Sequence, residues 1–111
     1  MATSIYNFPD ITKGNTFNSR KITFPFSITG ACIVMQFRRR AESAVIFEWK
    51  TADDTIEILS DTEVLMTTKT MDFSPYNYSY DTVITFLDGT TQTYFEGKLK
   101  INENISERCQ A

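Results

Sequence analysis

The chain has 111 residues, of which 41% are hydrophobic and 23% are charged. This amount of apolar material suits one packed domain, and it excludes both a second domain with its own core and an intrinsically disordered chain. Histidine is absent, which removes the commonest general base and the commonest zinc ligand and, with them, most hydrolase mechanisms. The formal net charge of −3 gives no global attraction to nucleic acid or to an anionic membrane surface.

The two cysteines, Cys32 and Cys109, have no spacing typical of a disulfide framework or of a metal site. We therefore expect free thiols in a chain made in a reducing compartment. The first residues lack a basic segment followed by an apolar stretch, and no apolar run approaches the roughly 18 residues of a membrane span. The sequence predicts a soluble protein without a cleaved secretion signal.

Residues 1–13 are predicted to form an extended arm ahead of the domain, because their apolar residues follow no regular period. Such an arm would expose an apolar patch unless it folds back or docks on a partner or a sister copy. Deleting residues 1–12 is expected to leave the domain folded. The apolar residues of the arm are Ile5, Tyr6, Phe8 and Ile11.

From residue 16 onward apolar residues recur at every second position, and β-branched and aromatic types are abundant, which predicts strands. Pro25 marks an edge position or a break in the first of them. The predicted strands before the last hairpin are residues 16–26, 31–38 and 44–50, followed by two short strands that hold Ile56 with Ile58 and Val64 with Met66.

Asp88-Gly89 lies between two alternating runs and predicts a hairpin whose two-residue turn has positive φ at both central positions. With Leu87 opposite Thr90, the turn determines the register along both strands. One mostly apolar face then contains the pairs Phe86 with Thr91, Ile84 with Thr93, Thr82 with Phe95, Tyr80 with Gly97 and Tyr78 with Leu99.

About seven strands separated by turns predict an all-β fold, and specifically an immunoglobulin-like antiparallel β-sandwich, with a small barrel as the main alternative. Trp49 suits the core of a sandwich, and Tyr78 or Tyr80 lies where the tyrosine corner of such domains falls. The sandwich is expected over residues 14–101, followed by a polar tail over residues 102–111.

Arg38, Arg39 and Arg40 form the only dense positive cluster of the sequence, in the turn between two predicted strands. One interpretation is a solvated loop balanced by Glu42 and Glu48. The other is a contact for an acidic surface of a partner protein.

The acidic residues suggest two further sites. Asp53, Asp54 and Asp61 are possible calcium ligands, but ordinary turns explain them because aspartate bonds its own backbone there. Asp81 and Glu96 face each other in the predicted register without the cleft of a glycosidase pair. We expect them to be like charges on an exposed face, relieved by the neighbouring Lys98.

Tyr76 and Tyr94 are the aromatic residues expected at the surface, because alternation directs Trp49, Tyr78 and Tyr80 inward. These two rings suggest an alternative function, a carbohydrate-binding module that recognises host-surface glycans. No combination of nucleophile, base and oxyanion-binding groups can be assembled from the sequence. We therefore predict no enzyme, and no catalytic, cofactor-binding or metal-binding residue.

Four short motifs carry a resemblance to a known family. They are Lys13-Gly14-Asn15-Thr16, Ile28-Thr29-Gly30-Ala31-Cys32-Ile33, Tyr78-Ser79-Tyr80-Asp81 and Asp88-Gly89. Between about residues 12 and 101 the chain resembles the small immunoglobulin-like domains of tailed-bacteriophage virions, in particular the N-terminal domain of baseplate upper proteins and related fibre, adaptor and neck components. It departs from that pattern at Ser74-Pro75, where the family commonly has a glycine.

The resemblance implies a structural protein of the virion, in a head fibre, neck or baseplate, made in the cytoplasm of a bacterial host. It implies capsid, portal or tail subunits and further copies of the chain as partners. It implies no cofactor, nucleic acid, membrane or small-molecule substrate. The residues expected to contact partners are Ile5, Tyr6, Phe8 and Ile11 of the arm and Arg38, Arg39 and Arg40 of the turn.

Overall fold

The computed structural model describes residues 4–40 and 42–103, and in this part the regular elements are strands, apart from one 3₁₀ turn. No helix among these residues is long and apolar enough to span a membrane. The elements are β1 (Ser4–Ile5), β2 (Ile11–Thr12), β3 (Thr16–Phe17), β4 (Arg20–Thr23), β5 (Cys32–Arg38), β6 (Val45–Lys50), the 3₁₀ turn η1 (Thr51–Asp53), β7 (Ile56–Ile58), β8 (Glu63–Met66), β9 (Lys69–Thr70), β10 (Tyr76–Thr85) and β11 (Thr91–Asn102).

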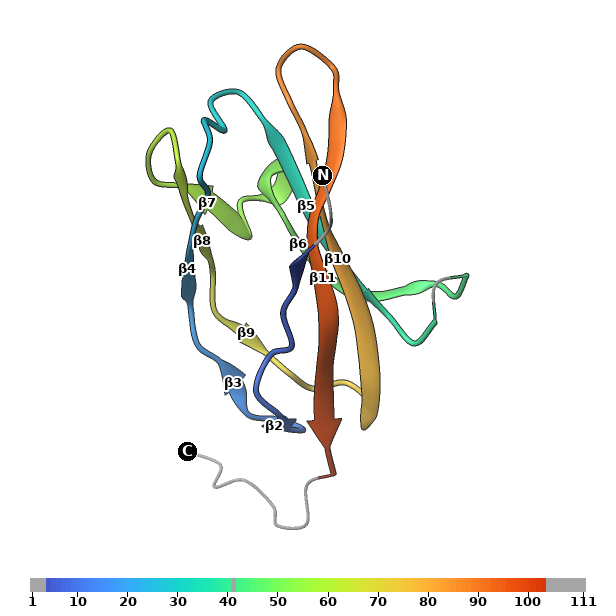
Figure 1. The fold of residues 1–111 in the computed structure, drawn as a ribbon. Helices are drawn as coiled ribbons and strands as arrows, with labels where there is room; N and C mark the ends of the chain where they lie inside the picture. The colour runs from blue at the N-terminus through green and yellow to red at the C-terminus, as the bar shows by residue number, and fades with distance from the viewer. Residues whose placement is uncertain (1–3, 41, 104–111) are drawn as a thin grey trace.

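The strands form two layers, as Figure 1 shows. The larger sheet has the order β1-β11-β10-β5-β6, and β2 also pairs with β11. The other layer contains the sheet β4-β8-β7 and the short pair β3-β9, which continues the same two chain segments. The predicted all-β class is confirmed, and the arrangement is compatible with a β-sandwich.

The strand predicted over residues 16–26 is broken into β3 and β4. Its last part is irregular: Phe24 is buried, with 2% of its surface exposed, and Pro25 follows outside the strand. The strands predicted near residues 31–38 and 44–50 correspond to β5 and β6. Of the two isoleucines in the short β7, Ile56 is buried whereas Ile58 is 46% exposed.

Aromatic side chains fill the space between the layers. Phe37 stacks on Phe47, with ring centroids 4.7 Å apart, and on Tyr80, at 4.8 Å. Trp49 is fully buried, lies edge-on to Phe37 at 5.4 Å and donates a hydrogen bond from Nε1 to the carbonyl of Thr67 at 2.9 Å. Each such ring pair contributes about 0.5–1.5 kcal/mol beyond the burial of its area, so the cluster joins β5, β6 and β10 to the second layer.

The β10–β11 turn differs from its prediction. Phe86 donates to the carbonyl of Thr90 at 2.7 Å, and Gly89 donates to the carbonyl of Phe86 at 2.9 Å, so the loop has three residues rather than two. Within this loop only Gly89 has a positive φ, at 93°. Asp88 accepts hydrogen bonds from the hydroxyl and the amide of Thr90, and these bonds lower the pKa of Asp88.

A bulge in β11 compensates for the longer loop. Thr82 is opposite Phe95, but the next residue, Val83, is opposite Thr93, so Tyr94 is the extra residue. Both Tyr94 and Phe95 therefore turn toward the core. The predicted pairs Tyr78 with Leu99, Tyr80 with Gly97 and Thr82 with Phe95 are confirmed. Those of Ile84 and Phe86 are wrong by one residue, and Leu87 lies in the loop instead of opposite Thr90.

The left-handed backbone of Gly89 predicts that a side chain at this position lowers the stability of the domain. A Cβ there would meet nothing within 4 Å, so any loss of stability comes from the left-handed backbone alone. We expect Gly89→Ala to lower the free energy of unfolding by about 1–2 kcal/mol, and Gly89→Asn to lower it less because asparagine tolerates this conformation. Urea unfolding measures both; equal stability of the two variants and the wild type would contradict this account.

Candidate interaction site

The N-terminal arm lies along β11 instead of extending ahead of the domain. β1 and β2 pair with β11 in parallel, with Ile5 opposite Glu96 and Ile11 opposite Ile101. Between them the amide of Tyr6 donates to the carbonyl of Glu96 at 2.7 Å, and further along that of Phe8 donates to the carbonyl of Lys98 at 2.9 Å. Residues 4–13 thus belong to the edge of the larger sheet.

Phe8 anchors the arm in the core of its own chain. Only 6% of its surface is exposed, and its ring lies 5.1 Å from that of Tyr80 and 5.7 Å from that of Phe17. We expected Phe8 to contact a partner, but in this structure it is a core residue. Truncating a buried phenylalanine to alanine typically costs about 3–5 kcal/mol, so the expectation that the domain folds without residues 1–12 conflicts with this packing.

Gly97 allows the arm to approach β11 closely. A Cβ at this position would overlap the carbonyl oxygen of Tyr6. That same oxygen accepts a hydrogen bond from the hydroxyl of Tyr80 at 2.7 Å, and the side-chain oxygen of Asn7 accepts one from the amide of Lys98 at 3.0 Å. Burial, with the nearby phenol of Tyr6 as a smaller cause, raises the pKa of Tyr80. The Tyr80 hydroxyl therefore stays protonated and keeps donating at neutral pH.

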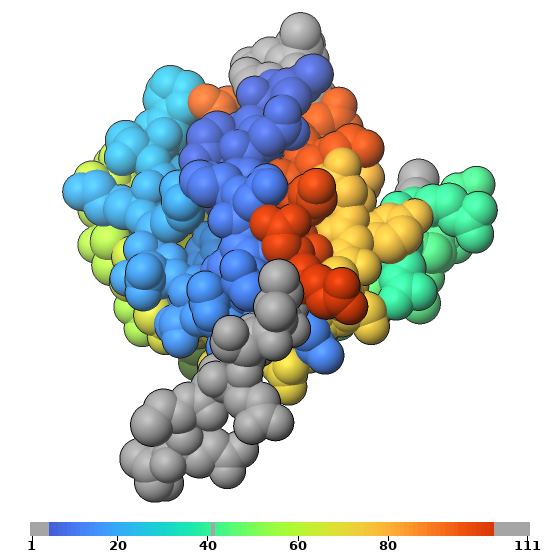
Figure 2. Space-filling model, turned by 90° about the horizontal axis from the view of Figure 1, so that it is seen from below, coloured from blue at the N-terminus to red at the C-terminus, as the bar shows by residue number. Residues whose placement is uncertain are grey.

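The arm presents the other predicted partner residues at the surface. Ile5 is 74% exposed and Tyr6 is 43% exposed, whereas Ile11 is half-buried. Figure 2 shows the arm, in dark blue, between the chain segment of β3 and β4 and that of β11. Arg20 joins the arm to the second layer, because its guanidinium donates to the hydroxyl of Tyr6 at 3.1 Å and lies over the ring of Phe8.

A cleft of about 490 Å³ lies between the arm and β4, and its lining includes Ile5, Ile22 and Tyr94. Within the described residues β4 is the last strand of its sheet. The amide of Phe24 points to the carbonyl of Thr62 just beyond β8, so alternation directs the backbone groups of the odd-numbered residues of β4 away from β8. The cleft thus combines an apolar lining with an open strand edge.

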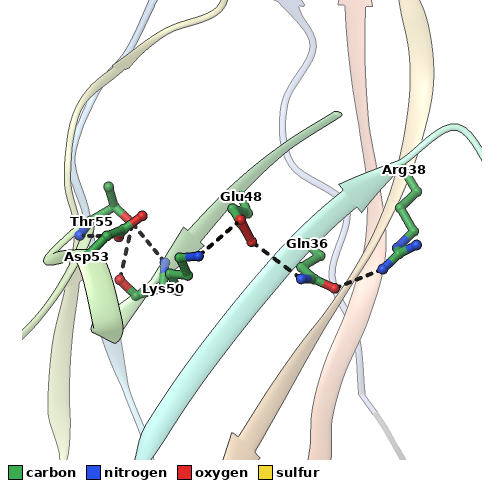
Figure 3. A network of polar contacts seen from close by, with 6 residues as sticks. All are labelled: Gln36, Arg38, Glu48, Lys50, Asp53 and Thr55. Atoms are coloured by element: carbon green, nitrogen blue, oxygen red, sulfur yellow. Dashed lines mark hydrogen bonds and ion pairs between the residues drawn. The ribbon is translucent and has the colours of Figure 1, made fainter. Parts of the chain in front are cut away.

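The turn that carries Arg38, Arg39 and Arg40, here called the arginine turn, is only partly free to contact a partner. Arg38 is half-buried and donates to the carbonyl of Ser43 at 2.6 Å and to the side chain of Gln36 at 3.0 Å (Figure 3). The guanidinium of Arg39 lies 5.5 Å from the ring centroid of Tyr76. Arg40 is exposed, and its backbone amide donates to the hydroxyl of Ser43. The arginine cluster therefore combines one cation held within the sheet with two near its surface.

The structure favours the turn interpretation of the aspartates. Asp53 accepts hydrogen bonds from the hydroxyl of Thr55 at 2.6 Å and from its amide at 3.1 Å, and these bonds lower the pKa of Asp53. Among the residues that the structure describes, no three His, Cys, Asp or Glu side chains are grouped so that they could hold a metal ion. Asp81 and Glu96 are both exposed and directly opposite one another, as predicted.

The two rings predicted for sugar binding lie in different environments. Tyr76 is 43% exposed. Tyr94 is half-buried, with its ring 5.2 Å from that of Phe24 and 5.3 Å from that of Phe26. The expectation that Tyr94 lies on the outer face is therefore wrong, because the bulge turns it toward the core. Cys32 is an exposed free thiol, whereas Cys109 and the rest of the predicted tail from residue 104 onward lie outside the described residues.

No protein-family model matches the chain, and no curated protein matches it significantly.

The close approach at Gly97 predicts that Gly97→Ala separates the arm from β11. We expect the amides of Tyr6 and Phe8 to lose protection against hydrogen exchange, and the free energy of unfolding to fall by about 1–3 kcal/mol, as in other overpacked sites. Gly89→Ala is the matched control for the exchange measurement: it also lowers stability through its left-handed backbone, but a Cβ there meets nothing within 4 Å, so the amides of Tyr6 and Phe8 should stay protected. If both amides stay protected in Gly97→Ala, the arm does not depend on this contact.

Proposed function

We propose that this chain is a non-enzymatic, immunoglobulin-like structural protein of a tailed-bacteriophage virion, which self-associates and attaches to capsid or tail neighbours. The sequence motifs of the first strand, the second strand and the last hairpin support the family. The same motifs fit a component of a head fibre, a neck or a baseplate.

The strand order is the single observation that most supports the immunoglobulin-like part of this proposal. In immunoglobulin-like sandwiches one layer has strands C′, C, F and G side by side, and the other has B, E and D. Here β6-β5-β10-β11 has the first order, and β4-β8-β7 has the second. The parallel β1 then takes the outer place beside β11.

A tyrosine contact gives further support to the immunoglobulin-like assignment. Tyr78, near the start of β10, is fully buried and donates from its hydroxyl to the carbonyl of Ser74 at 2.5 Å. A tyrosine at the start of strand F that bonds to the backbone a few residues upstream is the tyrosine corner of this fold. Trp49 departs from the pattern, because it lies on β6 instead of on β5.

We propose that the chain attaches to its neighbours through two surfaces. One is the arm edge, which is the edge of the larger sheet at β1, and the other is the arginine turn. At the arm edge, the exposed Ile5 and the ring of Tyr6 border the cleft beside β4. Apolar side chains at an open strand edge favour strand addition by a neighbouring protein. Arg39 and Arg40 supply cations for an acidic neighbour.

The virion assignment is tested by locating the chain in purified particles of the virus that encodes it, by cryo-electron microscopy. We expect a fixed number of copies at symmetry-related positions of the head, neck or tail. Detection of the chain in infected cells, together with its absence from purified particles, would refute a virion role.

The attachment surface predicts different effects for two exposed apolar residues. Ile5 is 74% exposed and Leu87, at the tip of the β10–β11 hairpin, is 80% exposed, so serine at either position should leave folding almost unchanged. We expect Ile5→Ser to reduce incorporation into particles at least tenfold, and Leu87→Ser to have no effect. Quantitative immunoblots of purified particles measure this; normal incorporation of Ile5→Ser would exclude the arm edge as the attachment surface.

A further inference from the structure

The outer face of the larger sheet carries charges of both signs in neighbouring rows. The register places Glu96, Asp81, Gln36 and Glu48 in one line across β11, β10, β5 and β6. The next line toward the arginine turn contains Lys98, Ser79 and Arg38, and Lys100 follows opposite Asn77. We call Glu48, Asp81 and Glu96 the acidic row, and Arg38, Lys98 and Lys100 the basic group.

These side chains point away from the core. On β10 and β11 the buried residues alternate with them: Tyr78 and Tyr80 face inward on one strand, and Leu99 and Ile101 on the other. Successive side chains of a strand point to opposite faces, so the acidic row and the basic group share the outer face. Two residues of rise along β11 separate them, which is roughly 7 Å.

Most of these charges have no ion-pair partner among the residues that the structure describes. Asp81 and Glu96 are like charges directly opposite one another, an arrangement that destabilises a sheet. Within residues 4–40 and 42–103, no ion pair involves the side chain of Asp81, Glu96, Lys98 or Lys100. The charges of these four side chains are therefore not neutralised by ion pairs within the described part of a single copy.

Other side chains of the same face are already held in place. Figure 3 shows the line of contacts: Arg38 donates to Gln36, Gln36 donates to Glu48 at 3.3 Å, and Lys50 pairs with Glu48 at 3.4 Å. Ordering these side chains before association reduces the entropy that binding would cost. The side chains of the β5–β6 half of the face therefore have fixed positions before a partner binds.

We propose that this face binds a second copy of the chain about a two-fold axis that runs parallel to the rows, between the acidic row and the basic group. The axis reverses the direction along the strands, so Glu96 of each copy lies over Lys98 of the other, and Asp81 lies between Lys98 and Arg38. Two-fold interfaces require such a self-complementary patch. A partner with a single sign of charge would leave one of the rows unpaired, which favours a second copy.

This inference rests on the self-association that we propose above, and it names the surface responsible. Exposed charge pairs are screened by salt. We therefore expect dimers at about 20 mM salt that dissociate at about 500 mM salt, where the Debye length falls below roughly 5 Å. Sedimentation velocity of the wild-type chain measures the dimer fraction at both concentrations.

Charge reversal identifies the face. Glu96→Lys and Lys98→Glu each place like charges over one another, so each variant alone should dimerise at least tenfold more weakly than the wild type. Mixed in equal amounts, the two variants restore both contacts and should form a heterodimer. Glu57→Lys, at an exposed position on β7 in the other layer, is the matched control and should dimerise like the wild type.

The outcomes separate the inference from the proposed function. A wild-type chain that is monomeric at every salt concentration refutes both self-association and this face. A dimer that Glu96→Lys and Lys98→Glu leave unchanged refutes this face alone. Weakening by the single variants without recovery in their mixture refutes the two-fold pairing. Far-ultraviolet circular dichroism of each variant verifies that the strands are intact.

Discussion

The aromatic cluster around Phe37 is the constraint on which the rest of this small domain depends. A chain of 111 residues has limited area to bury, and here rings from several strands and from the arm converge on one region. Phe37 is stacked between Phe47 and Tyr80, and the ring of Phe8 lies 6.1 Å from it. Because Phe8 belongs to this cluster, the core that holds the layers together also places the arm on β11 and leaves Ile5 and Tyr6 at the surface.

Much of the larger sheet could be predicted from alternation. Buried residues at every second position of β5, β6 and β10 follow directly from the period of two, since each of these strands has one face on the core. The register of the last hairpin was predictable only up to Thr82 and Phe95. Asp88-Gly89 is compatible with turns of two and of three residues, and a one-residue difference at the loop needs one bulged residue to restore alternation.

The docking of the arm could not be read from periodicity. β1 and β2 have two residues each and pair in parallel with a strand roughly 90 residues away, so neither length nor local alternation identifies them. One signal was present in the sequence: Gly97 interrupts an otherwise regular strand, and an isolated glycine in a strand often marks a close backbone approach. The position of the arginine turn between two strands was predicted correctly. That Arg38 is held in place while Arg39 and Arg40 are exposed could not be predicted, because it depends on contacts with Gln36 and Ser43 that only the fold brings within reach.

The parallel pairing of the arm also has a consequence for biosynthesis. Ile5 leaves the ribosome well before its partner Glu96, because roughly 90 residues lie between them in the chain. At usual rates of translation the two are separated by several seconds, during which the ring of Phe8 has no β11 to cover it. Docking of the arm therefore has to wait until β11 has been synthesised.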